Sequence, residues 1–471
     1  MTRPQPGNLS PLDPTAAEPF YRQIYDRVRG AIATGVLKPG DRIPSARALA
    51  TELGLARGTV DGAYALLAAE GYIQARGQAG TVVASGIKPP VPLAAPVARP
   101  AEAAASFRPD SILPFQMGLP ALDAFPRKLW ARLGARCIRS TQPSDMVHPP
   151  VYGAPALRAE VAAYLQVSRG IDCVPSQIFV TTGYRTTLEL ICHALLKRGD
   201  RVWVEDPGFP PTRELLGQMD IPIVPVAVDA EGMAVDRAIA QAPDARAAVV
   251  TPAHHSPLCV SLSLPRRMAL LDWAARTGAW IVEDDYDGEY RYVSRPLPAL
   301  KSLDREGRVI YAGTFSKVLL PALRLAYVVV PPSQVARFEA IVHAFAGGSP
   351  MLTQAIVTAF IQQGHFARHI QRMRKLYAER RRVTVAALES VLGEHARIDA
   401  QPGGMHLVLR LRAGRSDRDL VARMREAGLY AEALSDWTAK ADGTSALLLN
   451  FTNVDSPATA AKLAQRMAAL M

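Results

Sequence analysis

Residues 309–317 read Val-Ile-Tyr-Ala-Gly-Thr-Phe-Ser-Lys, an apolar run that leads into a glycine-containing turn and a lysine. Helical patterns separate this run from similar ones at residues 178–180, 202–204, 247–250, 280–282 and 327–330. Continuous apolar runs of this length, alternating with helices, are typical of a mainly parallel β-sheet that is covered on both faces. The sequence therefore predicts an α/β fold whose ligands bind beyond the carboxyl ends of the strands.

Two of these strand ends carry residues with distinctive chemistry. Residues 283–289 read Glu-Asp-Asp-Tyr-Asp-Gly-Glu, and carboxylates crowded in this way repel one another unless a cation lies nearby. They could bind magnesium or hold a protonated ring nitrogen. Lys317, followed further along by Arg324, is either a solvated charge or an amine that forms an imine with a carbonyl ligand.

Two other strand ends suit an anion and a flat ligand. Residues 181–186 read Thr-Thr-Gly-Tyr-Arg-Thr before a helical pattern, and free backbone N–H groups at such a turn favour a phosphate. Residues 205–210 read Glu-Asp-Pro-Gly-Phe-Pro, a rigid turn that presents Phe209. Either turn could instead be purely structural, with Phe209 in the core.

A proline-rich stretch divides the chain into a small N-terminal module and a larger body. Residues 88–109 contain six prolines interleaved with alanine and valine, a composition that favours an extended spacer. We expect a module at residues 1–85, a spacer at 86–112 and a body at 113–471.

The N-terminal module reads as three helices followed by a β-hairpin. Apolar residues recur at helical spacing over residues 20–36, a second helix begins after Ser45, and a third follows the turn at Gly54. Residues 72–83 then form two short strands around a glycine-containing turn. This order is the plan of a winged helix-turn-helix, whose third helix enters the major groove of DNA.

Charge also favours a nucleic-acid partner. The chain of 471 residues has 54 Lys and Arg against 43 Asp and Glu, which gives a net charge of +11. The module itself carries nine basic against seven acidic residues, so one copy neutralises few phosphates. Because two linked copies on adjacent half-sites would bind much more tightly, we expect a homodimer.

Composition also excludes several classes of protein. The 49% share of hydrophobic residues is that of an ordinary globular chain, and no run approaches the ~18 apolar residues of a membrane helix. The first ten residues lack the apolar core of a signal peptide. The four cysteines have no spacing typical of a disulfide framework or a zinc site. We therefore expect a cytoplasmic protein without a membrane segment or a metal site.

The module resembles the DNA-binding domain of the GntR family. The resemblance rests on residues 21–24 (Tyr-Arg-Gln-Ile), 37–50, 57–60 (Arg-Gly-Thr-Val) and 70–72 (Glu-Gly-Tyr). The contacts that it implies are Ser45, Arg47, Arg57 and Thr59 with DNA backbone and bases, and Arg76 and Gln78 at the wing. Ala56 and Gly58 depart from the pattern, which usually has Ser and Asn there.

Nearly the whole chain resembles the MocR (GabR-like) branch of that family, whose C-terminal domain is similar to fold-type-I aminotransferases that use pyridoxal 5′-phosphate (PLP). The motifs lie at residues 204–210, 283–287, 313–317 and 364–369. The resemblance implies that Lys317 carries PLP as a Schiff base and that Asp284 keeps the pyridine nitrogen protonated. It places Tyr286 near the phenolic oxygen and Phe209 against the ring. The phosphate cradle that it implies consists of Gly183, Tyr184, Arg185, Thr314 and Arg324.

Two stretches depart from the family pattern. Residues 251–259 read Thr-Pro-Ala-His-His-Ser-Pro-Leu-Cys, where the family commonly has Thr-Pro-x-His-Gln-Phe-Pro-x-Gly. Residues 447–451 lack the arginine with which aminotransferases hold a substrate carboxylate. In addition, His148-Pro149 stands where fold-type-I enzymes usually have a Tyr-Gly that acts on the partner subunit. His254 and His255 could touch the cofactor or be purely structural, and the sequence assigns no role to His148.

The resemblance implies a transcriptional regulator in which the aminotransferase-like domain is a sensor rather than an enzyme. Such a protein binds double-stranded operator DNA and detects a small amine-bearing effector, or PLP itself, through exchange at Lys317. Two alternatives stay open: a working aminotransferase with an accessory DNA-binding module, and a body that has lost the cofactor and only dimerises.

Overall fold

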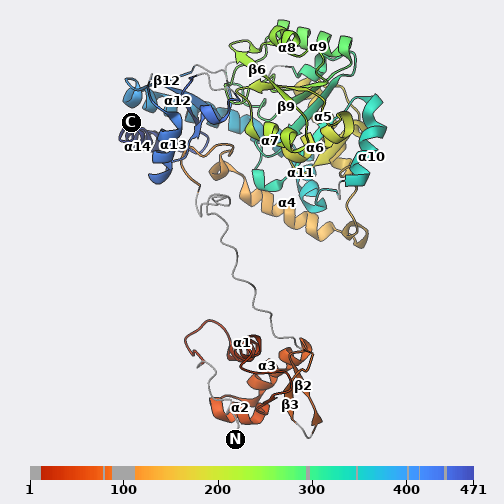
Figure 1. Ribbon diagram of the computed structural model, residues 1–471, viewed down its shortest axis with the longest axis vertical. Coiled ribbons are helices and arrows are strands. Elements are labelled where there is room, and N and C mark those ends of the chain that lie inside the picture. The colour runs from red at the N-terminus through yellow and green to blue at the C-terminus, as the bar shows by residue number, and fades with distance from the viewer. Residues whose placement is uncertain are drawn as a thin grey trace. The chain divides into compact units, whose positions relative to one another are not determined.

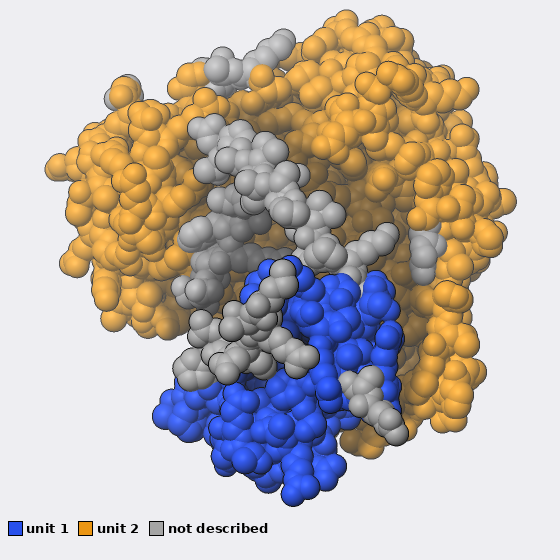
Figure 2. Space-filling model, turned by 60° about the horizontal axis from the view of Figure 1, so that its bottom comes forward, with its two compact units in different colours: residues 1–108 blue, residues 109–471 orange. Residues whose placement is uncertain are grey.

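The computed structural model describes residues 12–77, 80–86, 112–292, 298–345, 348–399, 403–412, 414–439 and 443–471. The chain forms two compact units, Met1–Arg108 and Pro109–Met471, which Figure 2 colours separately. The expected spacer at residues 86–112 lies almost entirely outside the described residues, so its boundaries stay a prediction.

The first unit has the predicted winged helix-turn-helix order. Its helices are α1 (Phe20–Ala33), α2 (Ala46–Leu53) and α3 (Arg57–Ala69), and its strands are β1 (Arg42–Ile43), β2 (Ile73–Ala75) and β3 (Thr81–Val83). The strands pair antiparallel in the order β1-β3-β2. One apolar cluster, which includes Ile24, Val60 and Ile73, joins the helices to this sheet. The sequence did not predict β1, a strand of two residues.

An eight-stranded sheet forms the centre of the second unit (Figure 1). Its order is β4-β11-β10-β9-β8-β5-β6-β7. The strand bounds are β4 (Ile178–Thr181), β5 (Val202–Asp206), β6 (Ile223–Asp229), β7 (Gly232–Met233), β8 (Ala247–Val250), β9 (Trp280–Asp285), β10 (Val309–Thr314) and β11 (Ala326–Val329). The strands from β10 to β6 run parallel, whereas β11 and β7 are antiparallel to their neighbours. The prediction of a mainly parallel sheet is therefore confirmed.

Helices cover both faces of this sheet. Successive side chains of a strand point to opposite faces, and accordingly Phe179 and Val180 belong to different apolar clusters. One face packs against α6 (Tyr184–Leu195), α7 (Pro210–Gln218) and α10 (Val335–Phe345). The other packs against α4 (Arg127–Ser140), α5 (Pro155–Arg169), α8 (Val235–Gln241), α9 (Leu264–Thr277) and α11 (Met351–Gln362).

A second, antiparallel sheet lies toward the C-terminus of the same unit, where Figure 1 shows the blue elements gathered together. Its order is β12-β13-β15-β14, with bounds β12 (Ala396–Ile398), β13 (His406–Leu411), β14 (Glu432–Ala433) and β15 (Ala446–Asn450). It packs with α12 (His365–Leu392), α13 (Asp417–Glu426) and α14 (Pro457–Ala468). The long α12 joins the two sheets, because Phe366 packs in the core of the large sheet and Leu388 in that of the small one. Within the described ranges, no helix is both long and apolar enough to cross a membrane.

Candidate functional site

A cavity of about 430 Å³ opens where the carboxyl ends of the parallel strands meet. All nine residues that the sequence assigns to a cofactor site line it. They are Gly183, Tyr184, Arg185, Phe209, Asp284, Tyr286, Thr314, Lys317 and Arg324. The structure therefore brings together residues from four separate strand ends.

Lys317 reaches the cavity from the turn after β10. Its Nζ donates a hydrogen bond of 2.9 Å to the carbonyl oxygen of Gly118. A Cβ atom on Gly118 would lie 2.7 Å from this Nζ, and the φ of +77° there also favours glycine. Burial lowers the pKa of Lys317, while the charges of Asp287, Glu432 and Asp284 act to raise it. The amine is thus held inside the protein, close to three carboxylates.

Four of the five carboxylates in residues 283–289 have partners within the protein. Asp285 and Glu289 form buried ion pairs with Arg169 at 2.6 and 3.0 Å. Glu283 accepts two backbone N–H hydrogen bonds, at 2.7 and 2.8 Å, and Asp287 lies 3.1 Å from Nδ1 of a buried histidine. In the part of the chain that the structure describes, no three His, Cys, Asp or Glu side chains are arranged to hold a metal ion.

Asp284 is the remaining carboxylate, and it faces the cavity. It has no hydrogen bond or ion pair to another described side chain. Burial raises the pKa of Asp284 well above its usual range, and the charges of Asp285 and Glu205 raise it further, whereas Lys317 lowers it. A carboxylate in such surroundings is stabilised by a cation placed beside it. Asp284 therefore suits a protonated ring nitrogen.

The start of α6 offers a binding site for an anion. Gly183 precedes the helix with a φ of +138° and provides no side-chain cap, so the first N–H groups of α6 are open to a ligand. A Cβ atom on Gly183 would lie 3.3 Å from Nη1 of Arg324. The guanidinium of Arg185 pairs with Glu214 at 2.7 Å on the surface, so Arg185 offers the cavity its backbone. Backbone amides and one guanidinium are a suitable cradle for a phosphate.

An aromatic wall completes this side of the cavity. The Phe209 ring lies 5.6 Å from the rings of both Tyr184 and Trp437. The Tyr184 hydroxyl is fixed by a 2.6 Å hydrogen bond with that of Thr212 in α7. Because the side chain of Phe209 is 36% exposed, its face is available to a flat ligand.

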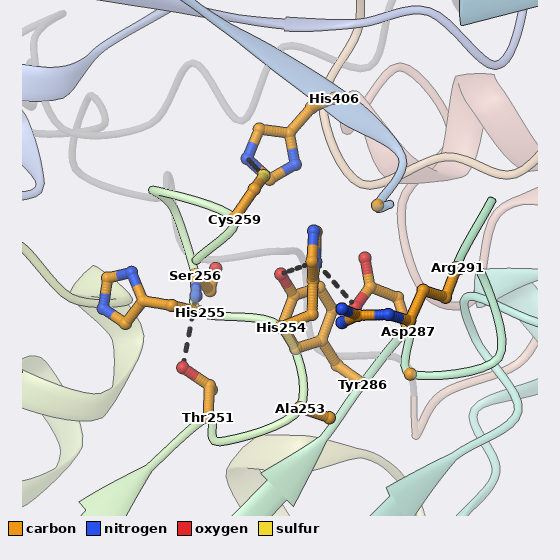
Figure 3. A network of polar contacts seen from close by, with 12 residues as sticks. Thr251, Ala253, His254, His255, Ser256, Cys259, Tyr286, Asp287, Arg291 and His406 are labelled. Atoms are coloured by element: carbon orange, nitrogen blue, oxygen red, sulfur yellow. Dashed lines mark hydrogen bonds and ion pairs between the residues drawn. The ribbon is translucent and has the colours of Figure 1, made fainter. Parts of the chain in front are cut away.

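A buried polar network contacts the hydroxyl group of Tyr286 (Figure 3). Its hydroxyl lies 3.3 Å from Nδ1 of His254, which in turn lies 3.1 Å from Oδ1 of Asp287. His254 and His255 are buried, and neither is among the described residues that line the cavity. Burial lowers the pKa of His255 to about 3, so this ring is neutral. His148, by contrast, is exposed.

A further set of cavity residues comes from distant parts of the chain and was assigned no cofactor role from the sequence, although Ser256 and Asn450 lie in the two stretches that depart from the family pattern. The residues concerned are Met117, Gly118, Ser256, Met405, His406, Glu432, Trp437 and Asn450. Asn450 ends β15 and donates to the carbonyl oxygens of Gln116 and Leu119 at 2.9 and 2.8 Å. His406, Glu432 and Asn450 lie on β13, β14 and β15, which come together only through long-range pairing, so no local pattern marks these three as cavity residues.

The predicted DNA contacts lie on α2, α3 and the hairpin of the first unit. Arg47, Arg57 and Arg76 are exposed, and Thr59 is half-buried. The Ser45 side chain caps α2 by accepting the N–H of Ala48 at 3.2 Å. Gln78 lies outside the described residues.

The start of α3 differs from that of α2. Ala56 stands at the N-cap and provides no side-chain hydrogen bond. Arg57 forms a 3.3 Å ion pair with Asp61, one turn later. The start of α3 therefore carries an exposed guanidinium and no side-chain cap.

Comparison with known proteins finds a family match for each of the two units. Residues 20–83 match the family described as bacterial regulatory proteins, gntR family, and residues 121–462 match aminotransferase class I and II. The probable rhizopine catabolism regulatory protein MocR of Rhizobium meliloti is 36% identical, over 94% of this chain and 92% of that protein. The pyridoxine biosynthesis transcriptional regulator PdxR of Corynebacterium glutamicum is 33% identical, over 95% and 94%.

A solved structure shares the fold of the second unit. It is LysN, the α-aminoadipate aminotransferase of Thermus thermophilus, determined with N-(5′-phosphopyridoxyl)-L-leucine. The TM-score is 0.69 at 28% identity, over 76% of this chain and 92% of LysN. A GntR-type module joined to an aminotransferase domain, together with full-length similarity to named regulators, supports a role in transcription regulation. The chain belongs to the MocR/GabR subfamily of GntR transcriptional regulators.

Proposed function

We propose that the cavity of the second unit holds PLP and that an amine bound there changes how the protein binds operator DNA. The observation that carries this proposal is Asp284, a half-buried carboxylate without a partner among the described residues, facing a cavity that Lys317 also lines. The solved relative with a phosphopyridoxyl ligand is consistent with it.

Each part of the cofactor has a fitting group in this chain. Asp284 stabilises a protonated pyridine nitrogen, and Phe209 packs on a face of the ring. Tyr286, held by His254, lies ready to hydrogen-bond the phenolic oxygen. The α6 N-terminus after Gly183, with Thr314 and Arg324, accepts the phosphate.

Lys317 supplies the resident amine. When bound, PLP provides an aldehyde carbon on which one primary amine can replace another. Because burial lowers the pKa of Lys317, a larger share of this amine is in the neutral, nucleophilic form than for an exposed lysine. An effector amine competes with Lys317 and, on binding, leaves it as a free amine in the cavity.

Regulation requires that the effector bind two states of the protein with different affinity. We place the two states in a homodimer in the cytoplasm that carries two DNA-binding modules. A change in the second unit then alters the spacing or orientation of the modules, and with it the fit to double-stranded DNA that carries two half-sites.

The test is the absorption spectrum after addition of PLP and removal of the excess. The unmodified protein gains a lysine-imine band near the visible edge, and so does the control Lys128→Ala, which changes an exposed lysine outside the cavity. Lys317→Ala lacks the band. An unchanged band in Lys317→Ala rejects the proposal.

A working aminotransferase is the second candidate function, favoured by the match of residues 121–462 to aminotransferase class I and II. Against it, β15 carries no arginine for the carboxylate of an amino-acid substrate. Sustained turnover of an amino donor with a keto acid decides between the two. If the protein is a regulator, we expect each protein molecule to carry out at most a single half-reaction of transamination.

A further inference from the structure

We infer that the effector is a diamine-like compound, a primary amine with a second cationic group, and that Glu432 binds this second group. The inference rests on the proposed function, because it concerns the amine that competes with Lys317. It names the chemical class of the effector, for which neither the fold nor the relatives provide an assignment.

Glu432 is a fixed carboxylate in the cavity wall. Its Oε1 accepts a hydrogen bond of 3.0 Å from the Tyr430 hydroxyl, and its Oε2 accepts one of 3.0 Å from Nε1 of Trp437. It forms no ion pair within the described part of the chain. Each oxygen keeps acceptor capacity, so the carboxylate is oriented and available to a cation from the cavity.

The cationic side chains that line the cavity do not neutralise the negative charge of Glu432. The guanidinium of Arg185 is paired with Glu214, and that of Arg324 lies beside Gly183 at the phosphate cradle. The third cationic group is Lys317, the amine that an effector displaces. While Lys317 is linked to the cofactor it is not a free ammonium group, so an entering ligand meets a carboxylate that has no ion-pair partner among the described residues.

His406 is the fourth basic side chain that lines the cavity, and its ring contacts other groups than Glu432. Its Nε2 lies 2.8 Å from the carbonyl oxygen of Pro257 and 3.3 Å from Sγ of Cys259. Burial lowers the pKa of His406, but the charge and hydrogen bond of Cys259 and the hydrogen bond to the Pro257 carbonyl together raise it overall. Any positive charge on His406 is thus balanced by Cys259 rather than offered to Glu432.

The neighbours of Glu432 favour a cation over an anion. Glu432 lies opposite Leu448 in the β14–β15 pair, and Leu448 is buried and aliphatic. The Trp437 ring that donates to Glu432 also lines the cavity, 5.6 Å from the ring of Phe209. A carboxylate beside an aromatic ring is a typical site for an ammonium group. A ligand carboxylate at the same place would be repelled.

The experiment titrates PLP-loaded protein with three amines of similar length: putrescine, butylamine and γ-aminobutyrate. They end in an ammonium, a methyl and a carboxylate group, so they differ where Glu432 acts. The readouts are the shift of the cofactor absorption band and the heat of binding by calorimetry. We expect putrescine to half-saturate at a concentration at least about tenfold below that of butylamine, with γ-aminobutyrate the weakest.

Glu432→Gln keeps the size of the side chain and removes its charge. We expect it to weaken putrescine binding by about tenfold and to leave butylamine binding unchanged. The control Glu394→Gln changes an exposed glutamate outside the cavity and alters neither. Putrescine binding that is no tighter than that of γ-aminobutyrate, or that is unaffected by Glu432→Gln, overturns the inference alone. A band that none of the amines shifts also overturns it, whereas protein that gains no band with PLP overturns the proposed function as well.

Discussion

At the scale of single residues, the segment 283–289 contains both carboxylates that are paired with a cation and one that is not. Asp285 and Glu289 share Arg169, while Asp284 faces the cavity without a partner among the described residues. Buried charge without a partner costs folding stability. Arg169 offsets that cost at Asp285 and Glu289. At Asp284, a cationic group of a ligand would offset it.

Asp284→Asn should have opposite effects on the cofactor-free protein and on cofactor binding. The pKa of Asp284 is raised in the folded state, so the folded protein binds this proton more tightly than the unfolded chain. Stability therefore falls as the pH rises above the unfolded value of about 4, and at neutral pH the carboxylate destabilises the cofactor-free fold. Asn removes that penalty and raises the melting temperature. It also weakens PLP binding by about tenfold to a hundredfold, the equivalent of one charged hydrogen bond.

Thermal unfolding without cofactor and a PLP titration measure the two effects. Asp272→Asn, at an exposed ion pair with Arg276, is the control and should change neither. If Asp284→Asn lowers both the melting temperature and the affinity, Asp284 is a structural residue.

Arg169→Met should destabilise the second unit by about 3–5 kcal/mol, because it leaves Asp285 and Glu289 buried without their cation. Chemical denaturation of the full chain measures the loss. Arg276→Met breaks an exposed pair in α9 and should cost under about 1 kcal/mol. Equal effects of the two substitutions would show that the buried network contributes nothing beyond a surface pair.

At the scale of elements, the parallel strands and the turns after them were predictable, because each is a continuous apolar run followed by polar residues within a few positions. β9 with Asp284 and β10 with Lys317 are examples. β14, with Glu432, was not predictable, because it has two residues and exists only through pairing with β15. The antiparallel direction of β11 was also missed, since a buried run has the same pattern in either direction.

The start of α3 provides a test at this scale. Ala56 has the extended backbone of an N-cap, with φ −64° and ψ 137°, close to the values of Ser45 at the start of α2. Ala56→Ser should therefore stabilise the first unit by about 0.5–2 kcal/mol, and Ser45→Ala should destabilise it by a similar amount. The melting of this unit in the full chain, followed by hydrogen exchange of α2 and α3 amides, measures both. A destabilising Ala56→Ser would mean that the α3 start cannot accept a cap.

At the scale of the whole molecule, both units could be assigned from motifs, and the predicted site residues that the structure describes lie on the expected elements. What the sequence could not indicate is the wall that Met117, His406, Glu432 and Asn450 contribute, because it depends on the fold of the C-terminal sheet. The part of the cavity that would distinguish effectors was thus the least predictable part.

DNA binding is also a property of the whole molecule. Arg57→Ala and Arg47→Ala should each lower affinity for operator DNA by about tenfold, and each lost phosphate contact should reduce the slope of log K against log salt by about one. Fluorescence anisotropy with one and with two half-sites measures affinity and the gain from a dimer. Arg198→Ala, an exposed arginine of the second unit paired with Asp220, should leave binding unchanged. Loss of affinity in Arg198→Ala equal to that in Arg57→Ala would contradict the assignment of α3.

The most direct test of the account is to locate the cofactor on the chain. The protein is incubated with PLP, reduced with borohydride to make the link to the amine permanent, digested and mapped by mass spectrometry, with and without operator DNA. We expect a phosphopyridoxyl group on the peptide that contains Lys317 and on no other lysine, in protein that still binds the operator. Attachment at another lysine, or none, would contradict it.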